Sequence, residues 1–152
     1  MILRKTSIFP ASREEVFDRL KRLKTLQYIS APYASFTPIA PNNAYTWQEG
    51  AVSSYYFRLF GIIPLGKHTI KIERFNQNYI QSRESNNFVP VWDHLIILKE
   101  YGDQTEYTDE VVIQAGWKTV FIWLWAKAFY THRQRKWIRL LTQNRKGGRF
   151  GT

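Results

Sequence analysis

A histidine and an aspartate in the stretch "VWDHLIILKEYGDQTEYTDEVVIQAG" have the side chains needed for acid–base chemistry. His94 and Asp109 lie on two apolar runs separated by Gly102 and Asp103. An imidazole titrates near neutral pH, and a carboxylate that orients the ring allows it to act as a general acid or base. Buried polar groups must also hydrogen-bond, so the pair can equally be structural. Both interpretations stay open on the sequence alone.

The turn chemistry between these runs predicts how close the two side chains lie. Residues 102–103, Gly-Asp, are typical of a two-residue hairpin turn. With this turn, His94 and Asp109 are diagonal neighbours on one face, and Lys99 pairs with Glu106 on the other as an exposed ion pair. A slip of one residue would separate His94 from Asp109. The apolar residues predicted on their face are Trp92, Ile96, Leu98, Tyr107, Val111 and Ile113.

Two further side chains are candidates for binding, and a third histidine is expected to face inward. His132 and Arg133, in "THRQRKW", are predicted near the middle of a long helix. Arg133 can bind a carboxylate or phosphate group bidentately, pair with a buried Asp109, or lie on a solvated helix face. His68 alternates with Ile70 and Ile72 and is expected to face inward.

Other kinds of site find no support in the sequence. The three histidines lack metal-site spacing, so neither a metal nor a cofactor is expected. The chain has no cysteine, and its "GIIPLG" loop lacks the Lys-Ser/Thr of a phosphate-binding loop. There is no nucleophile elbow. We therefore assign no catalytic residue, and His94 and Asp109 remain candidates.

The net charge of +10 is concentrated in the C-terminal part of the chain. Residues 1–110 hold 13 Lys/Arg and 12 Asp/Glu, whereas residues 111–152 hold nine Lys/Arg and no acid. This distribution is typical of a solvated helix face with a flexible basic tail, but it also suits an anionic membrane surface. Nucleic acid is not expected as a partner, because no recognised binding motif is present.

The elements that position these residues belong to one domain, residues 1–143, followed by a flexible basic tail, residues 144–152. A strand at residues 2–9 leads to a helix with a capping box at Ser12 and Glu15, then to a weak second helical turn around Leu26–Ile29. Antiparallel strands follow, with turn chemistry at residues 41–43, Pro-Asn-Asn.

A helix of about 25 residues from Trp117 carries two apolar stripes. Two stripes require two partners. The sheet is one partner, and the first helix, a second subunit in a homodimer or a lipid surface is the other. The first stripe comprises Trp117, Phe121, Leu124, Trp125 and Ala128, and the second comprises Trp123, Tyr130, Trp137 and Leu141.

Several segments, in this order, resemble the START/Bet v 1-like superfamily, also called SRPBCC, in a bacterial branch. They are "FPASREEVFDRL", "GIIPLGKHTIKIE", "VWDHLIIL", "TEYTDEVVIQAG" and "FYTHRQRKW", and the resemblance covers residues 2–141. It implies an α+β helix-grip fold in which about seven antiparallel strands curve around the long C-terminal helix. One or two short helices follow the first strand, and a deep apolar cavity separates sheet and helix. Members bind or transfer lipids, sterols and other hydrophobic molecules, and some are polyketide cyclases or dehydratases.

The resemblance implies binding, and in one version transport, of a hydrophobic small molecule or lipid between sheet and helix. One alternative is a cyclase or dehydratase that uses His94 and Asp109, and another is a membrane-surface or interaction module. The N-terminus lacks the apolar core of a signal peptide, so we expect a soluble, cytoplasmic protein. The expected ligand-binding residues are Trp92, His94, Ile96, Leu98, Tyr107, Asp109, Val111, Phe121, Trp125, Phe129, His132 and Arg133.

Overall fold

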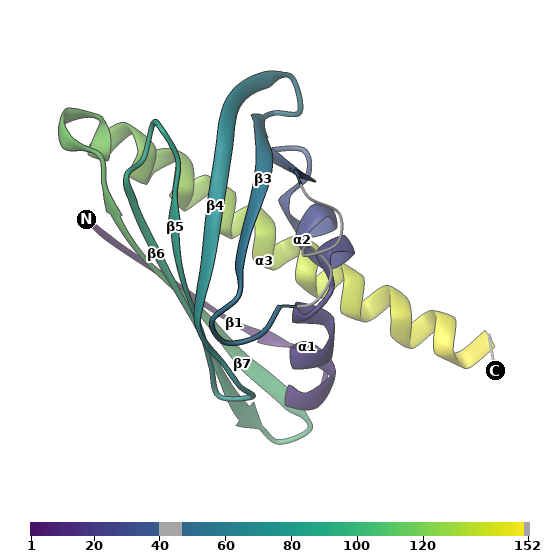
Figure 1. Ribbon diagram of the computed structural model, residues 1–152. Helices are drawn as coiled ribbons and strands as arrows, with labels where there is room; N and C mark the ends of the chain where they lie inside the picture. The colour runs from purple at the N-terminus through teal and green to yellow at the C-terminus, as the bar shows by residue number, and fades with distance from the viewer. Residues whose placement is uncertain (40–46, 151–152) are drawn as a thin grey trace.

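The protein folds as one antiparallel sheet with a long helix across it and two short helices beside it (Figure 1). The computed structural model describes residues 1–39 and 47–150, with side chains through residue 143. The predicted α+β helix-grip arrangement is confirmed. The elements are β1 (Ile2–Phe9), α1 (Arg13–Leu20), α2 (Leu23–Ser30), β2 (Ala34–Pro38), β3 (Val52–Leu59), β4 (Ile63–Phe75), β5 (Tyr79–Ser85), β6 (Val91–Tyr101), β7 (Gln104–Gln114), the short 3-10 helix η2 (Gly116–Lys118) and α3 (Thr119–Phe150).

The seven strands are ordered β1-β7-β6-β5-β4-β3-β2. Neighbours from β2 to β7 follow one another along the chain, as in a meander of hairpins. β1 instead pairs with β7, so that Ile2 lies opposite Val112 and Phe9 opposite Thr105. This pairing joins the beginning of the domain to the strand that leads into α3.

The predicted register of the β6–β7 hairpin is confirmed. Tyr101 pairs with Gln104, so Gly102 and Asp103 form the two-residue turn, and Gly102 has the positive φ of +63° that such turns require. Ile96 then lies opposite Asp109, and His94 opposite Val111.

The ion pair predicted across this hairpin is wrong. Lys99 does lie opposite Glu106. Within residues 1–39 and 47–143, however, neither side chain forms an ion pair. Both point toward solvent, where holding two long side chains together costs about as much entropy as their attraction returns.

The short helices follow their local signals. The Ser12 hydroxyl accepts a hydrogen bond from the Glu15 backbone N–H at 3.2 Å, which is the predicted cap of α1. The predicted weak turn around Leu26–Ile29 is part of a full helix, α2, because Leu23, Leu26 and Ile29 recur on one buried face.

The two stripes of α3 have different surroundings. In the second stripe Tyr130, Trp137 and Leu141 are buried. The Trp137 ring packs at 5.6 Å from Phe9 and 5.9 Å from Tyr107. These three side chains therefore face the core, so of the alternatives for the two stripes a lipid surface and a second subunit do not apply to them.

The first stripe is mostly exposed, because α3 begins at the open end of the sheet. Trp117 is 82% exposed and Phe121 is 67% exposed, and Leu124 and Ala128 are exposed as well. No helix in the described part of the chain is both long and apolar enough to cross a membrane.

Two predicted segments, residues 144–152 and residues 41–43, lie partly or wholly outside the described residues. α3 continues to Phe150, so the long helix extends past the boundary predicted at residue 143. The flexibility predicted for residues 144–152 lies outside the described side chains and stays a prediction. The turn predicted at residues 41–43 lies outside the described residues.

The burial of Trp137 predicts a large contribution to stability. We expect Trp137→Ala to lower the free energy of unfolding by about 3–5 kcal/mol, because it leaves a cavity between α3, β1 and β7. Trp117→Ala is the matched control and should change that free energy by about 0.5 kcal/mol or less. Urea unfolding followed by circular dichroism measures both. Equal losses in the two variants would contradict this assignment of the core.

Candidate functional site

A pocket of about 530 Å³ lies between the sheet and α3. This volume falls within the roughly 300–1,000 Å³ that is usual for small-molecule sites. Most of its wall is apolar and aromatic, drawn from β2 to β6 and from α3. Residues that form this wall include Phe36, Phe57, Ile70, Ile72, Ile80, Trp92, Ile96, Ile122, Trp125 and Phe129.

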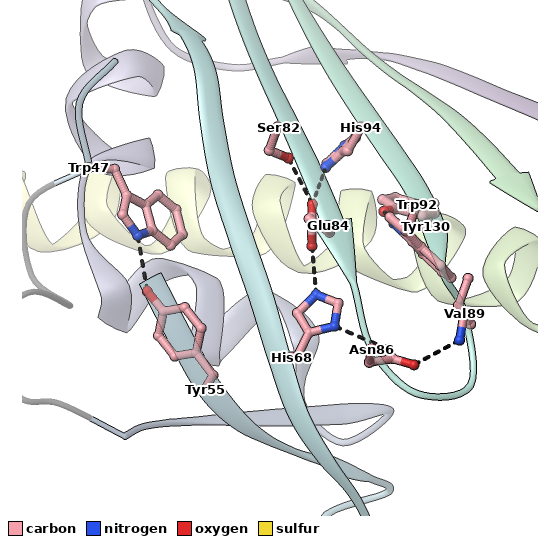
Figure 2. A network of polar contacts seen from close by, with 10 residues as sticks. All are labelled: Trp47, Tyr55, His68, Ser82, Glu84, Asn86, Val89, Trp92, His94 and Tyr130. Carbon is pink, nitrogen blue, oxygen red and sulfur yellow. Dashed lines mark hydrogen bonds and ion pairs between the residues drawn. The ribbon is translucent and has the colours of Figure 1, made fainter. Parts of the chain in front are cut away.

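Glu84 is the centre of the polar cluster in this pocket (Figure 2). One of its carboxylate oxygens, Oε1, lies 2.9 Å from His68 Nε2. The other, Oε2, accepts a hydrogen bond from the Ser82 hydroxyl at 2.8 Å and lies 3.7 Å from His94 Nδ1. Three neighbouring strands, β4, β5 and β6, thus direct polar groups to one carboxylate.

The hydrogen bonds of Asn86 define the tautomer of His68. The Asn86 side-chain oxygen accepts hydrogen bonds from the backbone N–H groups of Phe88 and Val89 at 2.8 and 2.9 Å. Its amide nitrogen must therefore be the donor in the 3.1 Å contact with His68 Nδ1. Since that ring nitrogen accepts, the proton is on Nε2 and is donated to Glu84. His68 is thus a neutral imidazole in this arrangement.

His94 lies between Glu84 and Asp109. Its proximity to Asp109 is the one that the hairpin register predicts. Its Nε2 is 2.7 Å from Asp109 Oδ1. Asp109 also accepts hydrogen bonds from the Tyr107 hydroxyl at 3.2 Å and from Gln134 Nε2 at 3.0 Å. Gln134 Nε2 additionally donates to the Lys5 backbone carbonyl at 2.9 Å, which connects α3 and β1 to this carboxylate.

The charges in this cluster support one another. Burial alone would raise the pKa of Glu84 and of Asp109, but hydrogen bonds from His68 and His94 to Glu84, and from His94 to Asp109, outweigh it and lower both pKa values. Burial would lower the pKa of His94, but its bonds to Asp109 and Glu84 outweigh that effect and raise it. The cluster thus favours two carboxylates with an imidazolium between them.

Arg133 lines the same pocket and is only 7% exposed. Burial would lower the pKa of its guanidinium, but the field of Tyr107, Asp109, Tyr130 and Glu84 raises it, so the group stays charged. Its Nε is buried without a hydrogen-bond partner.

The structure separates the predicted ligand-binding residues into three groups. Trp92, His94, Ile96, Phe121, Trp125, Phe129 and Arg133 line the pocket. Leu98, Tyr107, Asp109 and Val111 share the predicted face but are buried away from the pocket. Since strands β6 and β7 pass beyond the pocket, sharing a face does not bring every residue to it. That the lining residues contact a ligand stays a prediction.

His132 lies outside the pocket, so its predicted place there is wrong. Its Nε2 lies 2.6 Å from the Ala31 backbone carbonyl, and its ring is 4.7 Å from that of Tyr33. Successive helical residues are rotated by about 100°, so turning Arg133 inward directs His132 toward α2 and β2.

The sequence reasoning missed Glu84, although it expected His68 to face inward. In "YIQSRES" Ile80, Ser82 and Glu84 alternate with outward-facing residues, so the pattern places a carboxylate on the buried face. This alternation is the signal from which Glu84 could have been predicted to face the interior. Within residues 1–39 and 47–143, no set of three His, Asp or Glu side chains is arranged to hold a metal ion.

Comparison with known proteins identifies the family and the fold. A family model described as "Domain of unknown function (DUF8410)" matches residues 7–141. No curated protein sequence matches the chain. Solved structures that share its fold include a START superfamily protein from Mycobacterium smegmatis, with a TM-score of 0.69, 11% identity, and coverage of 93% of this chain and 97% of that one.

Two further structures extend this likeness. Ara h 8.0201 has a TM-score of 0.67 and 10% identity, and the match covers 94% of this chain and 98% of that one. DynU16, a putative protein in the dynemicin biosynthetic locus, has a TM-score of 0.64 and 15% identity over 94% of this chain and 48% of that one. The fold is therefore START/Bet v 1-like, as the sequence motifs predicted.

The raised pKa of His94 predicts how stability changes with pH. Protonated His94 stabilises the folded state fully below its unfolded pKa of about 6.5, and this contribution is lost as pH rises through the higher folded pKa. We expect the free energy of unfolding to fall as the pH rises above about 6.5, and His94→Gln to flatten this decrease. Denaturant unfolding at several pH values measures it.

The control for this experiment is His132→Gln, which removes an imidazole outside the cluster. It should keep the pH dependence of the unmodified protein. If His94→Gln retained the full decrease as well, protonation of His94 would not be its cause.

Proposed function

The chain belongs to the DUF8410 family and has the START/Bet v 1-like fold, and from this premise we propose that it binds a hydrophobic small molecule or lipid between the sheet and α3. One observation carries the proposal, namely a pocket of about 530 Å³ with an apolar wall and a single polar cluster. Members of the superfamily bind hydrophobic ligands, which supports the same conclusion. Transport of such a ligand is the extended form of this proposal.

We place binding ahead of the cyclase or dehydratase alternative because the polar groups are already engaged. A general base needs a free lone pair near the substrate. His94 meets a carboxylate on each side of its ring, and Glu84 accepts hydrogen bonds from two neighbours and has a lowered pKa. Glu84 is therefore a weak base, and a protonated His94 has no free lone pair to accept a proton, so the arrangement suits orientation of a ligand better than removal of its proton.

Blocking the pocket should abolish binding. Ile70 is buried in the pocket wall, and Ile70→Trp would fill part of its volume. We expect this variant to bind the uncharged dye Nile red at least tenfold more weakly than the unmodified protein, measured by fluorescence titration. Tyr79→Trp, which adds bulk at an exposed position outside the pocket, is the control and should bind normally.

Circular dichroism would verify that Ile70→Trp is folded. A native mass spectrum of the gently purified protein gives a second measure, because a retained ligand adds a discrete mass that is lost on denaturation. Unchanged dye binding by a folded Ile70→Trp would contradict the proposal.

We further propose that the protein contacts an anionic membrane surface. The contact is made by the end of the molecule where exposed side chains line the pocket. Trp117 and Phe121 there are largely exposed, and Ile62 on the β3–β4 hairpin is 78% exposed. The segments at this end, residues 58–67, 85–90 and 115–128, carry four Lys/Arg and no acid. Exposed aromatic side chains with nearby cations suit the interface of an anionic bilayer.

This proposal differs from the sequence-based one in its location. It rests on the exposed first stripe of α3 and the few cations near it, and not on the basic C-terminal segment, residues 111–152, as a whole. A hydrophobic ligand would then enter the pocket from the bilayer without crossing water.

Removing the exposed aromatics should weaken membrane contact. We expect the double variant Trp117→Ser/Phe121→Ser to lose most of its sedimentation with vesicles of phosphatidylglycerol and phosphatidylcholine, since less apolar surface enters the interface. The double variant Ile8→Ser/Tyr101→Ser is the control, because it removes exposed apolar side chains near the β6–β7 turn. Equal sedimentation of the two variants would contradict a role for this end of the protein.

A further inference from the structure

Arg133 is a buried cation without a direct carboxylate partner in the described residues. Its guanidinium forms no ion pair within 4.0 Å, because Glu84 and Asp109 are paired with the two histidines instead. Its neighbours are the Tyr107 hydroxyl and the Tyr130 ring, whose centroid is 5.5 Å away. Among the described residues only the Tyr107 hydroxyl is a hydrogen-bond partner of the guanidinium, so its other N–H groups retain unused donor capacity where the side chain lines the pocket.

This unused capacity points to an acceptor on the ligand. Leaving a buried donor unpaired costs more than an average hydrogen bond returns, and the cost is larger for a charged group. A ligand oxygen beside Arg133 would remove that cost, whereas a purely hydrocarbon ligand would leave the guanidinium unpaired and displace any water that reaches it.

The charges around Arg133 determine what kind of acceptor fits. Glu84 and Asp109 contribute two negative charges, and Arg133 and an imidazolium at His94 contribute two positive charges. His68 is neutral, because its Nδ1 accepts a hydrogen bond from Asn86. The cluster is thus balanced before any ligand enters, and an anionic ligand would add an uncompensated charge close to Glu84 in an apolar pocket.

We propose that the ligand is uncharged and carries a carbonyl-type oxygen that accepts hydrogen bonds from Arg133, with its apolar body against the aromatic wall. This inference rests on the proposed function, because it names the ligand class of the same pocket. It excludes the carboxylate or phosphate that the sequence alone suggested for Arg133. Aromatic ligands suit the wall especially, since Phe36, Trp92, Trp125 and Phe129 contribute to it.

Three naphthalenes of nearly equal shape test the proposal. 2-Acetylnaphthalene carries a neutral carbonyl, 2-naphthoate carries a carboxylate, and 2-ethylnaphthalene carries no acceptor. Trp92 and Trp125 line the pocket, so quenching of tryptophan fluorescence reports binding. At pH 7 we expect the acetyl compound to bind the unmodified protein about tenfold or more tightly than either of the others, since a hydrogen bond to a charged donor is among the stronger ones.

Arg133→Met should abolish the preference for the acetyl over the ethyl compound, because it removes the donor that only the acetyl compound can use and the unpaired charge that penalises the ethyl compound. Arg135→Met is the matched control, because Arg135 is an exposed arginine of α3 that does not line this pocket. It should keep the preference. If Arg133→Met does not fold, the comparison of the three compounds on the unmodified protein remains a sufficient test.

Each outcome has a definite meaning. Equal affinity for the acetyl and ethyl compounds would overturn the role of Arg133, and tighter binding of 2-naphthoate would identify an anion site instead. In both cases the pocket would still bind hydrophobic molecules, so the proposed function would stand. Binding of none of the three, with no Nile red bound either, would overturn the proposed function and this inference together.

Discussion

The architecture of this domain depends on a row of charged side chains that is buried in its interior. Glu84, His94 and Asp109 form a continuous ionic row across β5, β6 and β7, and each member is satisfied by the next. Such a row is costly to desolvate and is tolerated only when every polar atom has a partner. This requirement explains why Ser82 and Gln134 lie at its two ends, where they occupy the Glu84 Oε2 and Asp109 Oδ2 oxygens that would otherwise lack hydrogen bonds.

The same row connects the sheet to the long helix. Gln134 joins Asp109 to the Lys5 backbone carbonyl, and its side-chain oxygen accepts from the Ser7 hydroxyl, so α3, β1 and β7 meet at one polar point. On one side of this polar point Trp137 and Leu141 fill the core. On its other side lies the pocket. A polar layer therefore divides the interior into a packed half and a hollow half, and the hollow half contains the candidate site.

Sequence reasoning predicted what depends on local signals. The Gly102–Asp103 turn is specified by two adjacent residues. Together with the alternation of side chains along each strand, it determines the register that brings His94 to Asp109. The contact between Glu84 and His94 could not be predicted in that way, because β5 and β6 are joined by a longer loop whose register no turn rule specifies. The phase of α3 was ambiguous for a similar reason. Two apolar stripes do not reveal which one faces the sheet, so His132 and Arg133 could not be distinguished.

The pairing of β1 with β7 has a consequence for synthesis of the chain on the ribosome. Thr6 contacts Thr108, 102 residues later. At about 5–20 residues per second, the first strand must wait roughly 5–20 seconds before its partner has been made. During that interval its backbone N–H and C=O groups form an open sheet edge available to other chains. The polar middle of "ILRKTSIF", with two charged and two hydroxyl side chains between apolar ends, makes this unpaired strand a poor template for aggregation.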